Sequence, residues 1–234
     1  MLLLDPLTES DITEILHENN SIEDPRAFIA NARSTGFEGF LANPLTLGIL
    51  AKTADEGRSP DSRSDAFEKA FRTMVAEHND EHLGARLPAD ADQILDTAGR
   101  LFATLLISGA AGCARNPNAA SEDYPYMAAC GRGNAECREA VGTKLFSYLK
   151  EGQVVPVHRH VAEFLGARHL ASLIRDGLPA SRVVALMAGP DGGIVTQLRG
   201  LAGWLAAHSP EVRLDFIERD PVGVGLYGDI KCFS

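Results

Sequence analysis

Residues 155–170 read VPVHRHVAEFLGARHL, and this stretch decides the interpretation of the sequence around it. A short β-like run passes directly into a segment whose apolar residues Val161, Phe164 and Leu170 recur at helical spacing. His158 therefore stands at the start of a helix, where an imidazole beside backbone N–H groups suits an anionic group. The alternative is a polar first turn on an ordinary core helix, which residue chemistry alone favours.

Most of the remaining sequence also has a helical pattern, punctuated by Asn, Asp, Gly and Pro where helices start and end. We expect helices at about 8–20, 25–35, 44–56, 64–82, 88–106, 134–150, 181–188, 193–207, 210–218 and 221–234. Residues 109–133 have no hydrophobic period and are predicted to form a surface loop. The predicted fold class is mainly α, and the run before His158 is the only β-like segment of any weight.

Two of these helix starts depend on identifiable capping residues. Thr8 is followed three residues later by Asp11, which makes an imperfect capping box. Asp24 precedes Pro25, whose fixed φ suits a first helical turn. Asn43 and Pro44 repeat that pattern before a run with few polar residues, so the helix that begins there is expected to be buried on nearly all sides.

Composition excludes several classes of function. The 234 residues are 45% hydrophobic and carry a formal net charge of -10, which argues against nonspecific nucleic-acid binding. Four cysteines without a Cys-x-x-Cys pair indicate neither a disulfide framework nor a zinc knuckle. The sequence contains no signal-peptide core and no uncharged stretch of membrane-spanning length. We therefore expect a cytoplasmic protein that does not act at a membrane.

Two patterns suggest chemistry only weakly. His78 to His82 formally matches His-x-x-Glu-His, but a hydrophilic last helical turn explains it better, and no third ligand can be named. Cys113, Cys130 and Cys137 with His158 have irregular spacing for a zinc site, so no metal is predicted. No Gly-x-x-x-x-Gly-Lys-(Ser/Thr) motif occurs, so this chain alone is not expected to hydrolyse ATP.

The opening stretch resembles a signature near the winged-helix region of NACHT-type STAND NTPases, Phe-x-His-x-(Ser/Thr)-x-x-Glu-(Phe/Tyr)-x-Ala-Ala-x-x-Leu. The positions in step are His158, Glu163, Phe164, Ala167 and Leu170. The positions that depart from it are Val157, His160 and Gly166.

Three upstream segments are similar to pieces of the same family, in the family's order. Residues 4–12 (LDPLTESDI) resemble the end of the NTPase core, and residues 39–47 (GFLANPLTL) resemble its Leu-x-x-Asn-Pro-Leu-x-Leu helix start. Residues 58–67 (RSPDSRSDAF) resemble the Leu-Pro-x-(Ser/Thr)-Arg segment that follows. The resemblance covers most of residues 1–176.

The resemblance implies a lid that closes over a nucleotide. Pro44 would pack near the base and His158 would reach the ADP phosphate, with ATP or ADP bound only together with a P-loop core that this sequence lacks. The core would be a partner in cis or in trans, and the chain is then expected to be a fragment, an internal translation product or one piece of a split gene. A donor that engages ADP only in the closed form can shift a conformational equilibrium.

The resemblance also implies a domain order. Residues 1–20 would end the NTPase core, 21–108 would form the helical lid, 109–176 a loop and winged-helix-like domain, and 177–234 the start of short antiparallel helical repeats. The complete protein would be an ATPase that oligomerises when its repeats bind a protein ligand or effector, for instance in bacterial antiviral defence. The main alternative is a helical-repeat scaffold without a nucleotide role. A metal-dependent hydrolase is a distant third.

Overall fold

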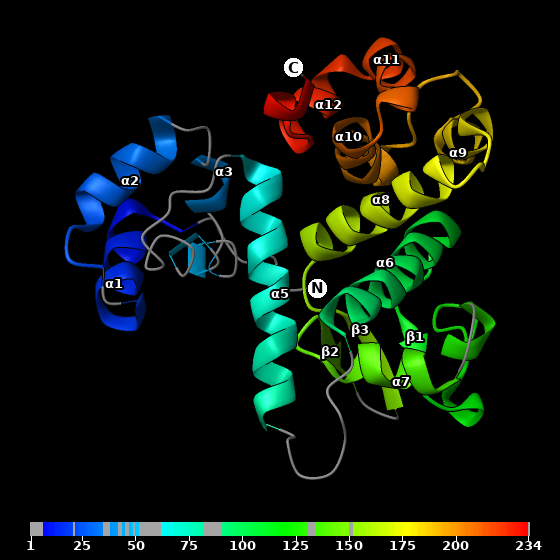
Figure 1. Ribbon diagram of the computed structural model, residues 1–234, viewed down its shortest axis with the longest axis horizontal. Helices are drawn as coiled ribbons and strands as arrows, with labels where there is room; N and C mark the ends of the chain where they lie inside the picture. Colours follow the sequence, from blue (N-terminus) through cyan, green and yellow to red (C-terminus); the bar gives the residue numbers. More distant parts are fainter. Residues whose placement is uncertain are drawn as a thin grey trace. The chain divides into compact units, whose positions relative to one another are not determined.

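The computed structural model describes residues 7–20, 22–34, 38–41, 44, 47–48, 50–51, 62–81, 90–130, 134–149 and 152–233. They belong to two compact units, residues 1–70 and 71–234, which are treated separately below. The boundary falls within helix α5 (Arg63–Glu81). Helices dominate the described residues and a small antiparallel sheet accompanies them, which confirms the mainly α fold class (Figure 1).

The first unit contains α1 (Glu9–Asn20), α2 (Pro25–Ser34) and α3 (Glu38–Leu41). The predicted capping box is present, because the Thr8 backbone N donates to Asp11 Oδ2 at 2.8 Å and the Asp11 backbone N donates to Thr8 Oγ1 at 3.3 Å. The Asp24 carboxyl also caps α2 as predicted, accepting from the Ala27 backbone N at 3.0 Å. Short polar side chains thus fix both helix starts.

The second unit is built around α8 (Arg159–Arg175), which packs against α6 (Ala91–Ser108) and α10 (Arg199–His208), as Figure 1 shows. Glycines allow the close approach of α6 and α8. A Cβ atom on Gly99 would lie 2.5 Å from the Leu165 carbonyl oxygen, and one on Gly166 would lie 3.2 Å from the Ala103 backbone N. Larger side chains at these two positions would force the helices apart.

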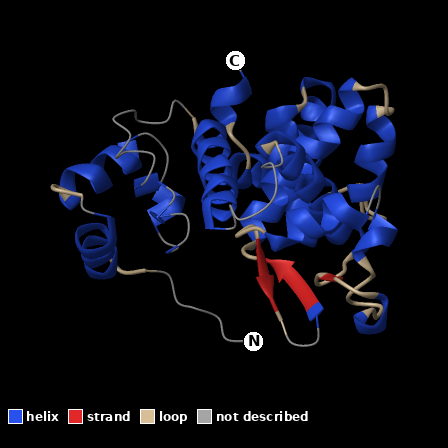
Figure 2. Ribbon diagram, turned by 60° about the horizontal axis from the view of Figure 1, so that its bottom comes forward, coloured by secondary structure: helices blue, strands red, loops and turns tan. Residues whose placement is uncertain are grey.

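Three short strands form one antiparallel sheet in the order β1-β3-β2 (Figure 2). The elements around it, in chain order after α6, are β1 (Cys113–Ala114), the 3-10 helices η1 (Pro117–Ala119) and η2 (Met127–Cys130), α7 (Asn134–Gly142), β2 (Phe146–Tyr148) and β3 (Gln153–Pro156). After α6, one strand, two 3-10 helices and the helix α7 thus precede the β2–β3 hairpin.

Two sequence predictions were wrong in this region. Residues 109–133 include strand β1, so they are not loop throughout, and the helix expected over 134–150 ends at Gly142 and is followed by strand β2. Strands of two or three residues are too short to show an alternating pattern. They form because β3 pairs with both, and because Phe146 stacks on Phe102 of α6 with ring centroids 4.6 Å apart.

The C-terminal part consists of short helices, much as the sequence predicts. They are α9 (Ala180–Met187), η4 (Thr196–Leu198), α10, α11 (Pro210–Arg219), α12 (Pro221–Tyr227) and η5 (Ile230–Phe233). α10 packs against both α11 and α12, which is packing of the helical-repeat kind. The helix expected from residue 193 begins only at Arg199, because Ile194 forms an isolated bridge with Ala188. Within the described ranges, none of the helices is both long and apolar enough to cross a membrane.

Candidate functional site

His158 is the N-cap of α8, two residues after the end of strand β3. Its backbone is extended, with φ -152° and ψ 147°, and its Nδ1 accepts a hydrogen bond from the His160 backbone N at 3.2 Å. An imidazole nitrogen that accepts carries no proton, so the proton of the neutral ring is assigned to Nε2. His158 thus presents an N–H donor at the positive end of a 17-residue helix.

The charge state of His158 follows from its surroundings. Burial lowers its pKa, the neighbouring His160 acts in the same direction, and Glu163 opposes the shift. The two imidazole rings have centroids 5.1 Å apart. Because the pKa lies below the ordinary histidine value of 6.5, the ring is neutral at pH 7 and acts as an uncharged donor.

A buried carboxyl group lies one turn further along the same helix. The Glu163 side chain is only 4% exposed and accepts from Arg159 Nε at 2.7 Å. Its other oxygen lies 3.2 Å from His160 Nδ1. The spacings of three and four residues place these side chains on one face of the helix. The first turn of α8 therefore combines the His158 cap with a hydrogen-bonded cluster of Arg159, His160 and Glu163.

The second predicted site residue, Pro44, lies in the first unit. It is helical and exposed, as a residue at the start of a helix can be. Leu47 and Leu50 beyond it are buried, whereas Asn43 and most of the helix expected over 44–56 lie outside the described residues. Pro44 and His158 belong to different units, so their joint role at a nucleotide remains a prediction.

The weak metal motifs find no support among the residues that can be described. Within those residues, no group of three His, Cys, Asp or Glu side chains could hold a metal ion. Cys113 and Cys137 are buried and are not joined in a disulfide. His82 of the His-x-x-Glu-His pattern lies outside the described residues.

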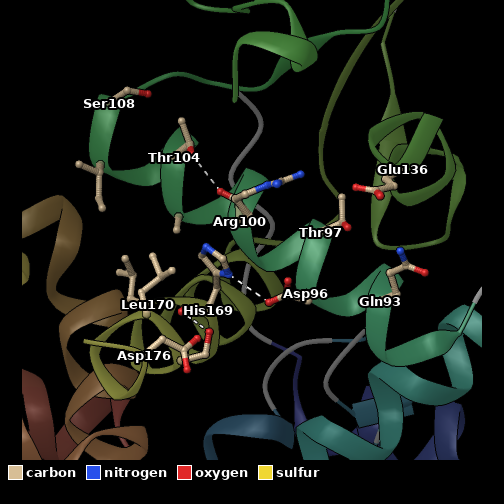
Figure 3. Close-up of a pocket in the computed structure, with 14 residues that line it drawn as sticks. Gln93, Asp96, Thr97, Arg100, Thr104, Ser108, Glu136, His169, Leu170 and Asp176 are labelled. Atoms are coloured by element: carbon tan, nitrogen blue, oxygen red, sulfur yellow. Dashed lines mark hydrogen bonds and ion pairs between the residues drawn. The ribbon is translucent and has the colours of Figure 1, made fainter. Parts of the chain in front are cut away.

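A groove of about 820 Å³ runs along α6 and α8 (Figure 3). No site was predicted from the sequence at this groove. Inside it, His169 Nδ1 lies 3.1 Å from Asp96 Oδ1, and this contact lowers the pKa of Asp96. Arg100, also on α6, directs Nη2 to Cys137 Sγ at 3.8 Å. The polar spacing along α6, at positions 93, 96, 97, 100 and 104, is the signal that could have revealed this groove.

The groove and the first turn of α8 are separate features. The groove is lined by Asp96, Glu136 and Asp176 together with Arg100, and its lining does not include His158. Carboxyl groups outnumber guanidinium groups there, so the lining is poorly suited to a phosphate. The first turn of α8 is therefore the better candidate site for an anion. Neither a known protein-family model nor a curated protein sequence matches this chain.

Proposed function

We propose that this chain is the lid and sensor-proximal part of a NACHT-like STAND NTPase, in which His158 donates a hydrogen bond to a phosphate of ADP. The observation that carries the proposal is the state of His158. Its Nδ1 accepts from the His160 backbone N–H, so the proton of the neutral ring is assigned to Nε2, which makes Nε2–H the donor of this ring at the start of α8. An uncharged donor at a helix N-terminus suits a phosphate oxygen.

The strand order supports the same proposal. The resemblance implies that the histidine belongs to a winged-helix domain, and the β1-β3-β2 sheet with α6, η2 and α7 has that element order. α8 follows the β2–β3 hairpin directly, so the hairpin and the histidine are joined by only Val157. A change in the position of this domain would move His158 with it, which is how a lid would sense whether ADP is held in a neighbouring P-loop core.

Removing the donor while keeping the cap tests the proposal. His158→Asn retains a side-chain oxygen that can accept from the His160 backbone N but lacks an N–H at the position of Nε2. A hydrogen bond to a charged group contributes about 1.5–3 kcal/mol, so we expect ADP to dissociate about 10- to 100-fold faster. The measurement is the release of fluorescent ADP from the chain joined to, or mixed with, a matching P-loop core.

His169→Asn is the matched control, because His169 lies on the same helix and contacts Asp96 rather than the first turn. We expect this variant to release ADP at the parental rate. If His158→Asn also releases ADP at the parental rate, the lid function is wrong and the scaffold alternative is favoured.

The scaffold alternative has an observation of its own. Five large apolar side chains of the C-terminal helical segments are more than half exposed, namely Leu186, Leu214, Val222, Leu226 and Ile230. A contiguous exposed apolar patch is typical of surfaces that bind another protein, and in a scaffold these side chains would contribute to such a patch. A scaffold would use them whether or not nucleotide is present, whereas a lid would bind its partner differently in the ADP-bound and ADP-free states.

A further inference from the structure

The Glu163 carboxyl contacts a second helix besides its own. It lies against Gly200 in the first turn of α10, where a Cβ atom would fall 2.2 Å from the Glu163 Cδ and 2.3 Å from Oε2. Only glycine can stand at that position while the carboxyl keeps its place. The positive end of the α10 dipole also favours a carboxylate there.

Arg159 strengthens this junction between the two helices. Besides holding Glu163 through Nε, its Nη2 donates to the carbonyl oxygen of Gln197, in the 3-10 turn that leads into α10. One guanidinium therefore holds both the buried carboxyl and the backbone directly before α10. A buried carboxylate that loses such a partner is strongly destabilised, so the junction is expected to move as a unit.

The contacts continue from α10 to α12. Arg199, the residue before Gly200, makes a bidentate ion pair with Asp220. Its Nε donates to Oδ2 at 2.6 Å and its Nη2 donates to Oδ1 at 2.7 Å. Asp220 is the N-cap of α12 and accepts from the Gly223 backbone N at 2.9 Å. The starts of α10 and α12 are thus tied to each other, and the start of α10 is tied to Glu163.

His160 completes the connection to the candidate site. Its ring lies 3.2 Å from the Glu163 carboxyl, while its backbone N–H is the donor that holds His158 Nδ1. A shift of the carboxyl therefore changes the residue that orients the His158 ring. The path from α10 to His158 consists of contacts between neighbouring groups at each step.

We propose that Glu163 is a positioning residue through which displacement of the C-terminal helices changes the orientation of His158. This inference rests on the proposed function, and it specifies how that function is regulated. A partner that moves the first turn of α10 would displace the carboxyl, loosen the His158 cap and release ADP. Reciprocally, bound ADP would oppose the movement of α10.

Gly200→Ala tests the coupling without altering any residue of α8, because the new methyl group occupies the space of the carboxyl. In the chain combined with a P-loop core, we expect ADP to dissociate on the order of tenfold faster, within the usual range of allosteric coupling. Gly225→Ala is the matched control, because nothing lies within 4 Å of a Cβ there. We expect it to release ADP at the parental rate.

A double-mutant cycle separates coupling from general loosening of the fold. If Gly200→Ala acts through His158, it has no further effect in the His158→Asn background, so the two substitutions are not additive. Additive effects, or no effect of Gly200→Ala, overturn the coupling and leave the proposed function intact. No effect of His158→Asn alone overturns the proposed function instead.

A second measurement uses the chain without nucleotide. The imidazole C–H resonances of His158, followed by NMR, are expected to shift in Gly200→Ala and to stay in place in Gly225→Ala. Unchanged resonances in Gly200→Ala overturn the coupling. If Gly200→Ala does not fold, Glu163→Gln replaces it, because it keeps the size of the side chain and removes its charge, and the same shift is expected.

Discussion

Replacing Phe164 with alanine is expected to lower the free energy of unfolding of residues 71–234 by about 3–5 kcal/mol. Phe164 is 1% exposed and lies at the junction of three helices. Its ring makes edge-to-face contacts with three other rings. The ring centroids are 5.5 Å apart for Phe71 of α5, 5.0 Å for Trp204 of α10 and 4.9 Å for His208 of α10. Truncation removes all three contacts and leaves a cavity that close-packed helices cannot fill. The measurement is urea unfolding followed by circular dichroism.

Leu214→Ala is the control for this experiment, because Leu214 is 72% exposed and its truncation is expected to change the free energy of unfolding by no more than about 0.5 kcal/mol. Phe164→Leu is expected to be milder than Phe164→Ala because it retains most of the apolar volume. A loss below about 1 kcal/mol for Phe164→Ala would show that this aromatic cluster is not part of the core.

Acidification from about pH 7 to pH 5 is expected to remove about 2 kcal/mol of stability through His208 alone. The pKa of His208 is lowered to about 4, mainly by burial and also by the positive charges of Arg168 and Arg175, while Asp229 opposes the shift. The folded pKa lies below the unfolded value of 6.5, so the unfolded chain binds the proton first. The stabilisation is complete above pH 6.5, declines as the pH falls, and is lost at about pH 4.

The pH effect is isolated by comparing the protein with His208→Phe at both pH values. The variant carries no titratable group at this position. Its loss of unfolding free energy between pH 7 and pH 5 is therefore expected to be about 2 kcal/mol smaller than that of the parent protein. His158, whose pKa is also lowered, remains in both proteins and cancels in the comparison. Equal losses in the two proteins would contradict a depressed His208 pKa.

Helix starts were predictable where a side chain adjacent in sequence makes the cap. Thr8 with Asp11, and Asp24 before Pro25, act in the structure as their spacing predicts. The start of α6 was placed too early, at Pro88, because Asp90 is the N-cap and accepts from the Asp92 backbone N at 3.1 Å. Local capping chemistry can be read from sequence, but the choice between two nearby cap candidates depends on packing.

The short strands and the contacts of the buried Glu163 carboxyl could not be predicted fully from the sequence. β1 and β2 exist because β3 pairs with them, and this tertiary cause leaves no period in so few residues. Glu163 stood in the family-like signature, and its spacing from Arg159 and His160 was visible. Its contact with Gly200, 37 residues later in the chain, could not be predicted from the sequence, because only the packing of α8 on α10 creates it.

The aromatic contacts around Phe164 also provide an optical reporter of this junction. Trp204 is the only tryptophan in the sequence and is 2% exposed. Its ring stacks on that of His208, with ring centroids 6.1 Å apart. Its intrinsic emission therefore arises from the α8–α10 contact and from nowhere else in the chain. A red shift of that emission on binding of a partner would record the opening of this contact in the unlabelled protein.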